Sequence, residues 1–280
     1  KNSYSKSLIW IPDFQYLHLP KLFSLRYKMF KFINIRLYIK HAYKILLSSF
    51  ASKRDLKKYD KILDKKILVN KFYFNIPPKN KLKNFNYLKK KYRLSKNYFY
   101  LPNQYWIHKN HKVVIDALKS LKNDNRISTI SIYSTGSKSD YRNPDHFFNL
   151  MKKIKENNLK NNFKYLGLVP YLDTMSLIYY SSAVINPSFF EGWSSTVEQA
   201  NAYNKILILS NIDVHKEQRP NKAIFFNPRN INSLKKILLN FNASKKNIKI
   251  IKNKKINFKV KLNKYTEDYL KIFNKYLKIK

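Results

Sequence analysis

Short apolar runs alternate with stretches of helical periodicity along most of this chain, and this alternation restricts its fold more than any other feature. Runs such as 98–101, 128–134 and 183–186 have the length and the β-branched or aromatic content of strands. The stretches between them place apolar residues at helical spacing. Strands that alternate with helices usually pair in parallel, so the pattern predicts an α/β protein.

A polar, proline-containing stretch at 77–85 divides the pattern into two parts. We expect a partial N-terminal domain at 1–85, a C-terminal domain at 86–260 and a terminal helix at 261–280. In the first part we predict strands at 8–11, 42–50 and 67–74, and helices at 24–40 and at 52–59, the latter with Ser52 as its N-cap. In the second part we predict strands at 98–101, 128–134, 163–166, 183–186, 206–209 and 223–226, and helices at 87–92, 112–121, 145–157, 171–180, 196–203, 231–239 and 262–277.

The formal net charge of +41 admits two interpretations. One is a polyanionic partner, either nucleic acid or an anionic membrane. The other is a coding bias, because the chain holds 49 lysines but only eight arginines and three glycines. A nucleic-acid binder would favour the bidentate guanidinium of arginine, so we favour the bias, with attraction to an anionic membrane surface as a secondary effect. The absence of cysteine excludes disulfides and cysteine-ligated metals.

Scarce glycine and scarce acid mark the loops where chemistry is expected. Gly136, Gly167 and Gly192 each follow a predicted strand, and Glu191 is one of only 16 acids. Ligands of open parallel sheets bind outside the carboxyl ends of the strands. There Lys109 would neutralise a diphosphate, and the amides at the helix start after Glu191 would bind an anion. This set of groups suits a nucleoside diphosphate that carries a sugar.

Residues 186–200 (NPSFFEGWSSTVEQA) resemble the E-x7-E region, usually PSxxEGFGxxxxEA, of the retaining family-4 glycosyltransferases, also described as glycosyl transferases group 1. Residues 101–112 (LPNQYWIHKNHK) resemble the diphosphate loop of that family. Residues 165–170 (YLGLVP) resemble its nucleobase loop, and residues 9–20 (IWIPDFQYLHLP) the late part of its N-terminal domain. The resemblance implies a GT-B fold with two Rossmann-like parallel-sheet domains, the N-terminal one incomplete.

The resemblance also implies roles for individual residues. Glu191, Lys109 and Asp13 would be catalytic, with Glu191 on the donor sugar and Lys109 on the leaving-group charge. The substrate-binding residues would be Gln104, Gly136, Gly167, Leu168, Gly192, Trp193, Ser194, Ser195, Glu198 and Gln199.

Three positions differ from the family pattern. Gln104 replaces an arginine, Gln199 replaces the second glutamate, and Pro12 replaces the histidine that precedes Asp13, although His18 lies nearby. Glu198, one place before Gln199, has the S-x-x-E spacing of a capping box with Ser195. Both a capping role and a ribose-binding role remain open for Glu198.

These features predict an enzyme that transfers a hexose from a nucleotide sugar to a glycan or lipid-linked acceptor, with retention and without a metal or other cofactor. We expect it in the cytoplasm, in part at the inner membrane face, in bacterial envelope polysaccharide synthesis. The alternatives are a non-catalytic remnant of such an enzyme and a charge-driven protein that binds nucleic acid or membrane. The basic helix at 24–40 could rest on a membrane, but we expect it to bury a face against the first sheet.

Overall fold

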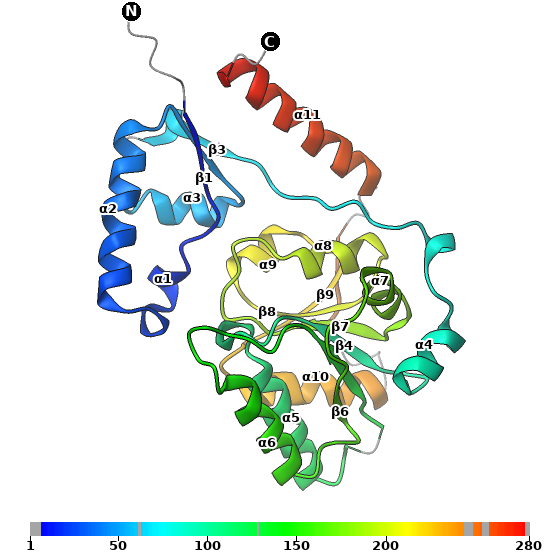
Figure 1. The fold of residues 1–280 in the computed structure, drawn as a ribbon. Helices are drawn as coiled ribbons and strands as arrows, with labels where there is room; N and C mark the ends of the chain where they lie inside the picture. Colours follow the sequence, from blue (N-terminus) through cyan, green and yellow to red (C-terminus); the bar gives the residue numbers. More distant parts are fainter. Residues whose placement is uncertain (1–6, 61–62, 128, 244–248, 254–257, 278–280) are drawn as a thin grey trace, which may run out of the picture. The chain divides into compact units, whose positions relative to one another are not determined.

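The computed structural model describes residues 7–60, 63–127, 129–243, 249–253 and 258–277. The chain forms two compact units, each with its own sheet (Figure 1). Unit 1 comprises Lys1–Phe74, Phe190–Ser195 and Ile256–Lys280, and unit 2 comprises Asn75–Phe189 and Thr196–Lys255. Unit 1 therefore includes part of the loop that enters α8, together with the terminal helix.

Unit 1 is built on a three-stranded parallel sheet of order β1-β2-β3. The strands are β1 (Leu8–Ile11), β2 (Lys44–Leu47) and β3 (Ile67–Val69). The helices are α1 (Gln15–His18), α2 (Leu25–His41), α3 (Phe50–Leu56) and α11 (Phe258–Leu277), with 3-10 turns at η1 (Pro20–Leu22) and η2 (Leu63–Lys66). The core forms where Ile11, Phe14, Ile45, Leu47 and Leu56 pack together.

Helix α2 packs on this core along a narrow stripe. Ile35 is buried, and Tyr38 and Ile39 are partly buried against the same cluster. The expected buried face therefore exists, but it is much narrower than expected. Most other apolar side chains of α2 are exposed.

Several boundaries in unit 1 differ from the sequence expectations, including both ends of the predicted helix 52–59, which is observed as α3 (Phe50–Leu56), and the start of the predicted helix 262–277, which is observed as α11 (Phe258–Leu277). The predicted strands 42–50 and 67–74 are shortened to β2 and β3 because only those residues enter the parallel ladder. The prediction that Ser52 is an N-cap is wrong. Ser49 caps α3 instead, since its Oγ accepts a hydrogen bond from the Ser52 amide at 3.0 Å.

Unit 2 holds a seven-stranded sheet of order β10-β9-β8-β7-β4-β5-β6. All neighbouring strands are parallel except β10, which is antiparallel to β9. The strands are β4 (Phe99–Pro102), β5 (Ile132–Thr135), β6 (Phe163–Tyr165), β7 (Ala183–Asn186), β8 (Leu207–Ser210), β9 (Lys222–Phe226) and β10 (Ile251–Lys252). The helices are α4 (Phe85–Tyr92), α5 (His111–Asn123), α6 (His146–Glu156), α7 (Tyr171–Tyr180), α8 (Ser195–Ala202), α9 (Asp213–Glu217) and α10 (Ile231–Ala243), with turns η3 (Lys79–Lys81) and η4 (Ile107–Lys109).

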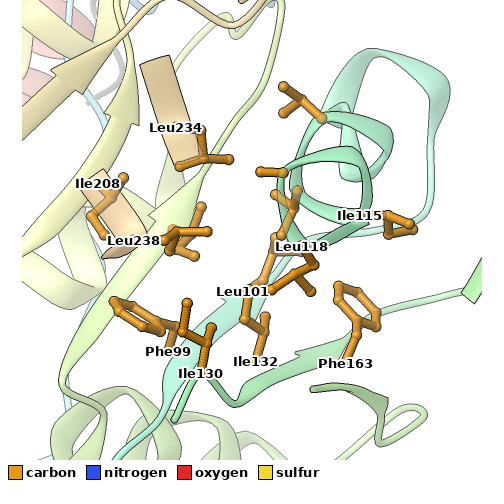
Figure 2. Packing of buried hydrophobic residues seen from close by; sticks show 14 of the residues in the cluster. Phe99, Leu101, Ile115, Leu118, Ile130, Ile132, Phe163, Ile208, Leu234 and Leu238 are labelled. Atoms are coloured by element: carbon orange, nitrogen blue, oxygen red, sulfur yellow. The ribbon is translucent and has the colours of Figure 1, made fainter. Parts of the chain in front are cut away.

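Helices cover both faces of this sheet because successive strand residues point to opposite sides. Phe99 and Leu101 face the cluster that includes Leu118 of α5 and Leu234 of α10. Figure 2 shows these side chains interdigitated with Ile132, Phe163 and Ile208. The intervening residue Tyr100 faces the second cluster, with side chains from α4, α7 and α8. Burial on both faces explains why these strands are continuous apolar runs.

The stretch 77–85, predicted as a linker, is part of unit 2 and packs against the rest of that unit. The Lys83 amide donates to Ser176 Oγ at 2.9 Å, and Tyr203 Oη donates to the Pro77 carbonyl at 2.7 Å. Leu82 also packs on the second cluster of unit 2. The α/β fold with parallel sheets is confirmed.

Candidate active site

The sheet of unit 2 has a topological switch point between β4 and β7. From β4 the chain proceeds outward through β5 and β6, and then returns to place β7 on the other side of β4. Such a point leaves a crevice at the carboxyl ends of the strands. Here Asn103 Nδ2 donates to Asn186 Oδ1 at 3.2 Å, and both side chains are buried. We call the loops that follow β4 to β9 at this end of the sheet the strand-end rim.

Gly136 lets two loops of the strand-end rim meet backbone to backbone. A Cβ at this position would lie 2.3 Å from the Asn103 carbonyl oxygen, and the residue has a φ of +141°. Its amide donates to the Gly167 carbonyl at 3.2 Å. Loops after β4, β5 and β6 are thus brought together at this point.

The Gln104 side chain also links the loops that follow β4 and β5. Its Oε1 accepts a hydrogen bond from the Ser137 amide. A glutamine can make this bond, whereas an arginine has no acceptor. The side chain therefore fixes the loop after β5 and adds no positive charge to the rim.

Lys109 is the last residue of the 3-10 turn η4, and hydrogen bonds hold the backbone of this turn. The Ile107 amide donates to Asp140 Oδ2 at 2.9 Å, and the Phe189 amide donates to the His108 carbonyl at 2.8 Å. Asn110 follows with left-handed backbone (φ +54°), and its side-chain amide donates to the Pro187 carbonyl at 3.1 Å. The backbone from which Lys109 projects is thus held in one conformation.

Asp140 and Arg142 belong to this arrangement and were missed in the sequence. Arg142 Nε donates to Asp140 Oδ1 at 3.0 Å, and Arg142 Nη2 lies 3.3 Å from His108 Nδ1. Because a guanidinium only donates, His108 Nδ1 is the acceptor. Burial alone would raise the pKa of Asp140, but hydrogen bonds from the Ile107 amide and Arg142 lower it below its ordinary value. The scarcity argument used for Glu191 could also have identified Asp140.

His111 has a packing role at the start of α5. Its ring stacks on Tyr105 with centroids 4.0 Å apart and an interplanar angle of 16°. Burial, with a smaller contribution from His146, lowers the pKa of His111 to about 3. The ring is therefore neutral at physiological pH. Within the described part of the chain, no group of three or more His, Cys, Asp or Glu side chains could hold a metal ion.

The loop after β6 carries the residues expected to face a nucleobase. Tyr165 Oη donates to the Gly136 carbonyl at 2.8 Å. Leu168, directly after Gly167, is 75% exposed and presents apolar surface at the rim. The start of this loop is therefore fixed by a hydrogen bond, and its apolar Leu168 side chain is accessible.

Helix α8 follows β7 and carries Glu198 and Gln199. Glu198 is buried, and its Oε1 accepts a hydrogen bond from Gln218 Nε2 at 2.9 Å. Gln199, the next residue, is half-buried. Thr196 Oγ1 donates to the Pro102 carbonyl at 3.3 Å, which fixes the first turn of α8 beside β4.

Within unit 1, residues 190–195 lie against the loop that follows β1. A Cβ on Gly192 would lie 2.8 Å from the Pro12 carbonyl oxygen and 2.9 Å from Asp13 Cβ. Glu191 is 7% exposed and Ser194 is buried, whereas Ser195 is exposed at the start of α8.

Trp193 is fixed in the same unit. Its indole nitrogen donates to the Phe72 carbonyl at 2.9 Å, and Lys71 Nζ lies 5.4 Å from its ring centroid. The cation–π contact orients a flat aromatic side chain one residue from Gly192.

His18, the nearby histidine, is paired with a buried acid. Its Nε2 lies 2.6 Å from Asp55 Oδ2, and its ring lies 5.0 Å from that of Phe190. Burial would raise the pKa of Asp55, but hydrogen bonds from His18 and Lys58 lower it. Unit 1 therefore brings together Asp13, Glu191, Gly192 and Trp193, with His18 fixed by Asp55.

Residues 80–257, more than half of the chain, match the family described as glycosyl transferases group 1. The chain belongs to this family. It therefore carries a glycosyltransferase domain, and its two parallel-sheet units correspond to the GT-B fold. No curated protein matches the sequence.

Solved glycosyltransferase structures share the fold at low sequence identity. A glycosyltransferase from Rickettsia africae ESF-5 has 20% identity and a TM-score of 0.68, over 88% of this chain and 67% of its own. HepE of Anabaena in complex with UDP-glucose has 15% identity and a TM-score of 0.69, over 94% and 71%. Sucrose-phosphate synthase of Thermosynechococcus elongatus has 11% identity and a TM-score of 0.69, over 96% and 68%. Among the described residues, no helix has the length and hydropathy needed to cross a bilayer.

Proposed function

We propose that this glycosyltransferase moves a hexose from a nucleotide-sugar donor to a glycan or lipid-linked acceptor, with retention of configuration and without a metal. We further propose that it is of the family-4 type and serves bacterial envelope polysaccharide synthesis at the inner face of the membrane. Residues 86–260 would form the donor-binding domain, and residues 1–85 would form part of the acceptor-side domain.

The observation that carries this proposal is the strand-end rim of unit 2. Gly136 and Gly167 bring three loop backbones together, and Lys109 projects from a fastened turn at the same end of the sheet. A cation and backbone amides at a switch point suit a diphosphate, and the exposed Leu168 suits the flat face of a base. HepE, which has this fold, was solved with UDP-glucose, so we propose a UDP-sugar as the first donor to test.

Charge stabilisation would be the main catalytic contribution. Departure of the nucleoside diphosphate develops negative charge, which Lys109 and the amides at the start of α8 would stabilise. Glu191 would hold hydroxyl groups of the donor sugar, since a buried carboxylate is a strong acceptor. A chelator should then leave turnover unchanged.

Replacement of Glu191 tests the catalytic part of the proposal. Glu191→Ala should reduce sugar transfer by about 100-fold or more, because the site loses an acceptor fitted to the reacting sugar. The measurement is release of nucleoside diphosphate from a panel of nucleotide sugars with a glycan acceptor. Glu156→Ala on the exposed surface of α6 is the matched control. Wild-type turnover in Glu191→Ala would contradict the proposed role.

One observation favours a second candidate, a non-catalytic remnant that still binds nucleotide. Gln104 uses its oxygen to hold the Ser137 amide, so the rim lacks the charge that an arginine would bring. The two candidates separate cleanly in one assay. Tight nucleotide binding without turnover on any donor would favour the remnant, and turnover would exclude it.

A further inference from the structure

Helix α2, labelled in Figure 1, belongs to unit 1, and many of its large apolar side chains are exposed. Six of its large apolar side chains are between 46% and 68% exposed, namely Leu25, Met29, Phe30, Phe32, Ile33 and Leu37. Only Ile35 of this helix is fully buried. Exposure of so many large apolar side chains on one helix of a folded protein usually marks a binding site.

The same helix carries only positive charge. Its sequence, LRYKMFKFINIRLYIKH, contains five lysines and arginines and no acid. Arg36 lies over the Phe32 ring at 4.8 Å, and Lys31 lies over the Tyr27 ring at 5.6 Å. Cations that stay close to exposed rings are typical of side chains at the boundary between lipid tails and headgroups.

A groove continues this surface toward η1. It has a volume of about 400 Å³ and lies between Leu17 and Pro20 on one side and Met29, Phe32 and Ile33 of α2 on the other. Lys28 lies at the groove as well. The groove therefore offers apolar walls with a cation beside them, as an anionic lipid would require.

We propose that the α2 surface, made of α2 and this groove, docks on an anionic lipid bilayer with the helix parallel to the membrane plane. Apolar side chains would enter the acyl boundary, while Arg26, Arg36 and Lys40 meet acidic headgroups. A second copy fits less well, because a two-fold contact through α2 would place these cations against one another. The helix does not span, since it is one of the described helices that lack the required hydropathy.

This inference rests on the proposed function only in that a lipid-linked acceptor would bring the enzyme to a membrane. Vesicle binding is measured without any sugar donor. Failure of docking and failure of sugar transfer are therefore separate results.

Vesicle flotation with the full chain tests the proposal. The vesicles are phosphatidylcholine alone, or phosphatidylcholine with phosphatidylglycerol. The double variant Arg26→Glu/Lys40→Glu should bind the acidic vesicles roughly tenfold or more weakly than the wild type, since each cation near such a surface contributes. Lys119→Glu/Lys155→Glu in unit 2 changes the net charge equally, at exposed positions on α5 and α6, and is the matched control.

A second pair of variants, at apolar positions, distinguishes insertion of the α2 surface from attraction by the net charge alone. Phe30→Ser on α2 should weaken binding several-fold, whereas Phe148→Ser on α6, at 67% exposure against 63%, should change it by less than about twofold. Circular dichroism and the thermal midpoint establish that each variant is folded. Both positions are exposed, so folding should persist.

Three outcomes would overturn the proposal. Equal losses in the two charge variants would show that the net charge alone attracts the vesicles. Unchanged binding of Phe30→Ser would show that the apolar surface is not inserted. A wild-type dimer in sedimentation that Phe30→Ser dissociates, with vesicle binding intact, would assign the surface to a second copy.

Discussion

At the scale of single residues, the strand-end rim depends on backbone contacts that tolerate no side chain. Gly136 combines a close approach to Asn103 with a positive φ, so two separate penalties apply to any other residue. Glycine scarcity indicated this position in the sequence. The contact between Gly136 and Asn103 could not be predicted from the sequence, because the two residues lie far apart along the chain and local patterns do not report such contacts.

Gly136→Ala should destabilise the protein by about 3 kcal/mol or more, since a Cβ would overlap the Asn103 carbonyl. Gly167→Ala is the matched control. That position has φ +85° but no atom within 4 Å of a Cβ, so the cost should be nearer 1 kcal/mol. Urea unfolding of both variants measures the difference. Equal losses would contradict the close packing of the two loops.

His111 makes stability depend on pH in a defined direction. Its pKa is about 3 in the folded protein and ordinarily 6.5. Between these values the unfolded chain binds a proton that the folded protein does not, so stability falls as pH drops from about 6.5 toward 3. One such group contributes a slope of up to about 1.4 kcal/mol per pH unit.

His111→Phe should flatten this slope while keeping a ring on Tyr105. His146, whose pKa is also lowered, mainly by burial, leaves a residual slope. Asp55, Asp116 and Asp140 have lowered pKa values, so their contribution to stability is lost only at lower pH. Urea unfolding between pH 4.5 and 6.5 measures the slope of stability against pH, because this range lies roughly above the pKa values of those three acids. An identical slope in the variant would refute the assignment.

At the scale of elements, asparagine replaces glycine where helices and turns need left-handed backbone. Asn110, Asn125, Asn158 and Asn204 all have positive φ. Asparagine tolerates this conformation better than other residues with a Cβ. The use of asparagine at these positions agrees with the coding bias inferred from composition.

The prediction of elements succeeded best in unit 2. Strands there are buried on both faces and bounded by Gly, Pro or Asn, so their apolar runs mark them to within a few residues. In unit 1 the predicted strands 42–50 and 67–74 were too long because apolar residues continue beyond the ladder. The N-cap at Ser49 was missed since Ser48, Ser49 and Ser52 are alike in sequence.

Ser49→Ala should destabilise the protein by about 1 kcal/mol, because the amide of Ser52 in α3 loses its acceptor. The Ser24 side chain accepts from the Tyr27 amide at the exposed start of α2, so Ser24→Ala is a solvent-accessible control with a smaller loss. Chemical denaturation compares the two variants. A larger loss at Ser24 would contradict the packing of α3 in the core.

At the scale of the whole molecule, positive charge dominates the long-range electrostatics. The chain has 57 lysines and arginines against 16 acids. Most described ion pairs have an exposed partner, such as Lys57–Asp64 at 2.5 Å, and such pairs contribute little. Repulsion among unpaired cations therefore weakens the folded state at low salt.

Added salt should therefore raise the thermal midpoint by several degrees as the screening length falls to roughly 8 Å near physiological ionic strength. Differential scanning fluorimetry over a series of sodium chloride concentrations measures the thermal midpoint. Sodium sulfate would also stabilise the fold by exclusion, so chloride is the informative salt. A midpoint that falls with chloride would mean that specific ion pairs outweigh the repulsion.

The proposed donor site in unit 2 is tested most directly by titration calorimetry with UDP. UDP should bind the wild type, and Lys109→Ala should weaken the affinity about tenfold or more by removing a cation from the diphosphate. Lys112→Ala, at an exposed position three residues on whose side chain pairs with Asp116, should bind as the wild type does. Equal affinity in all three proteins, or no heat with UDP, GDP or ADP, would contradict the site.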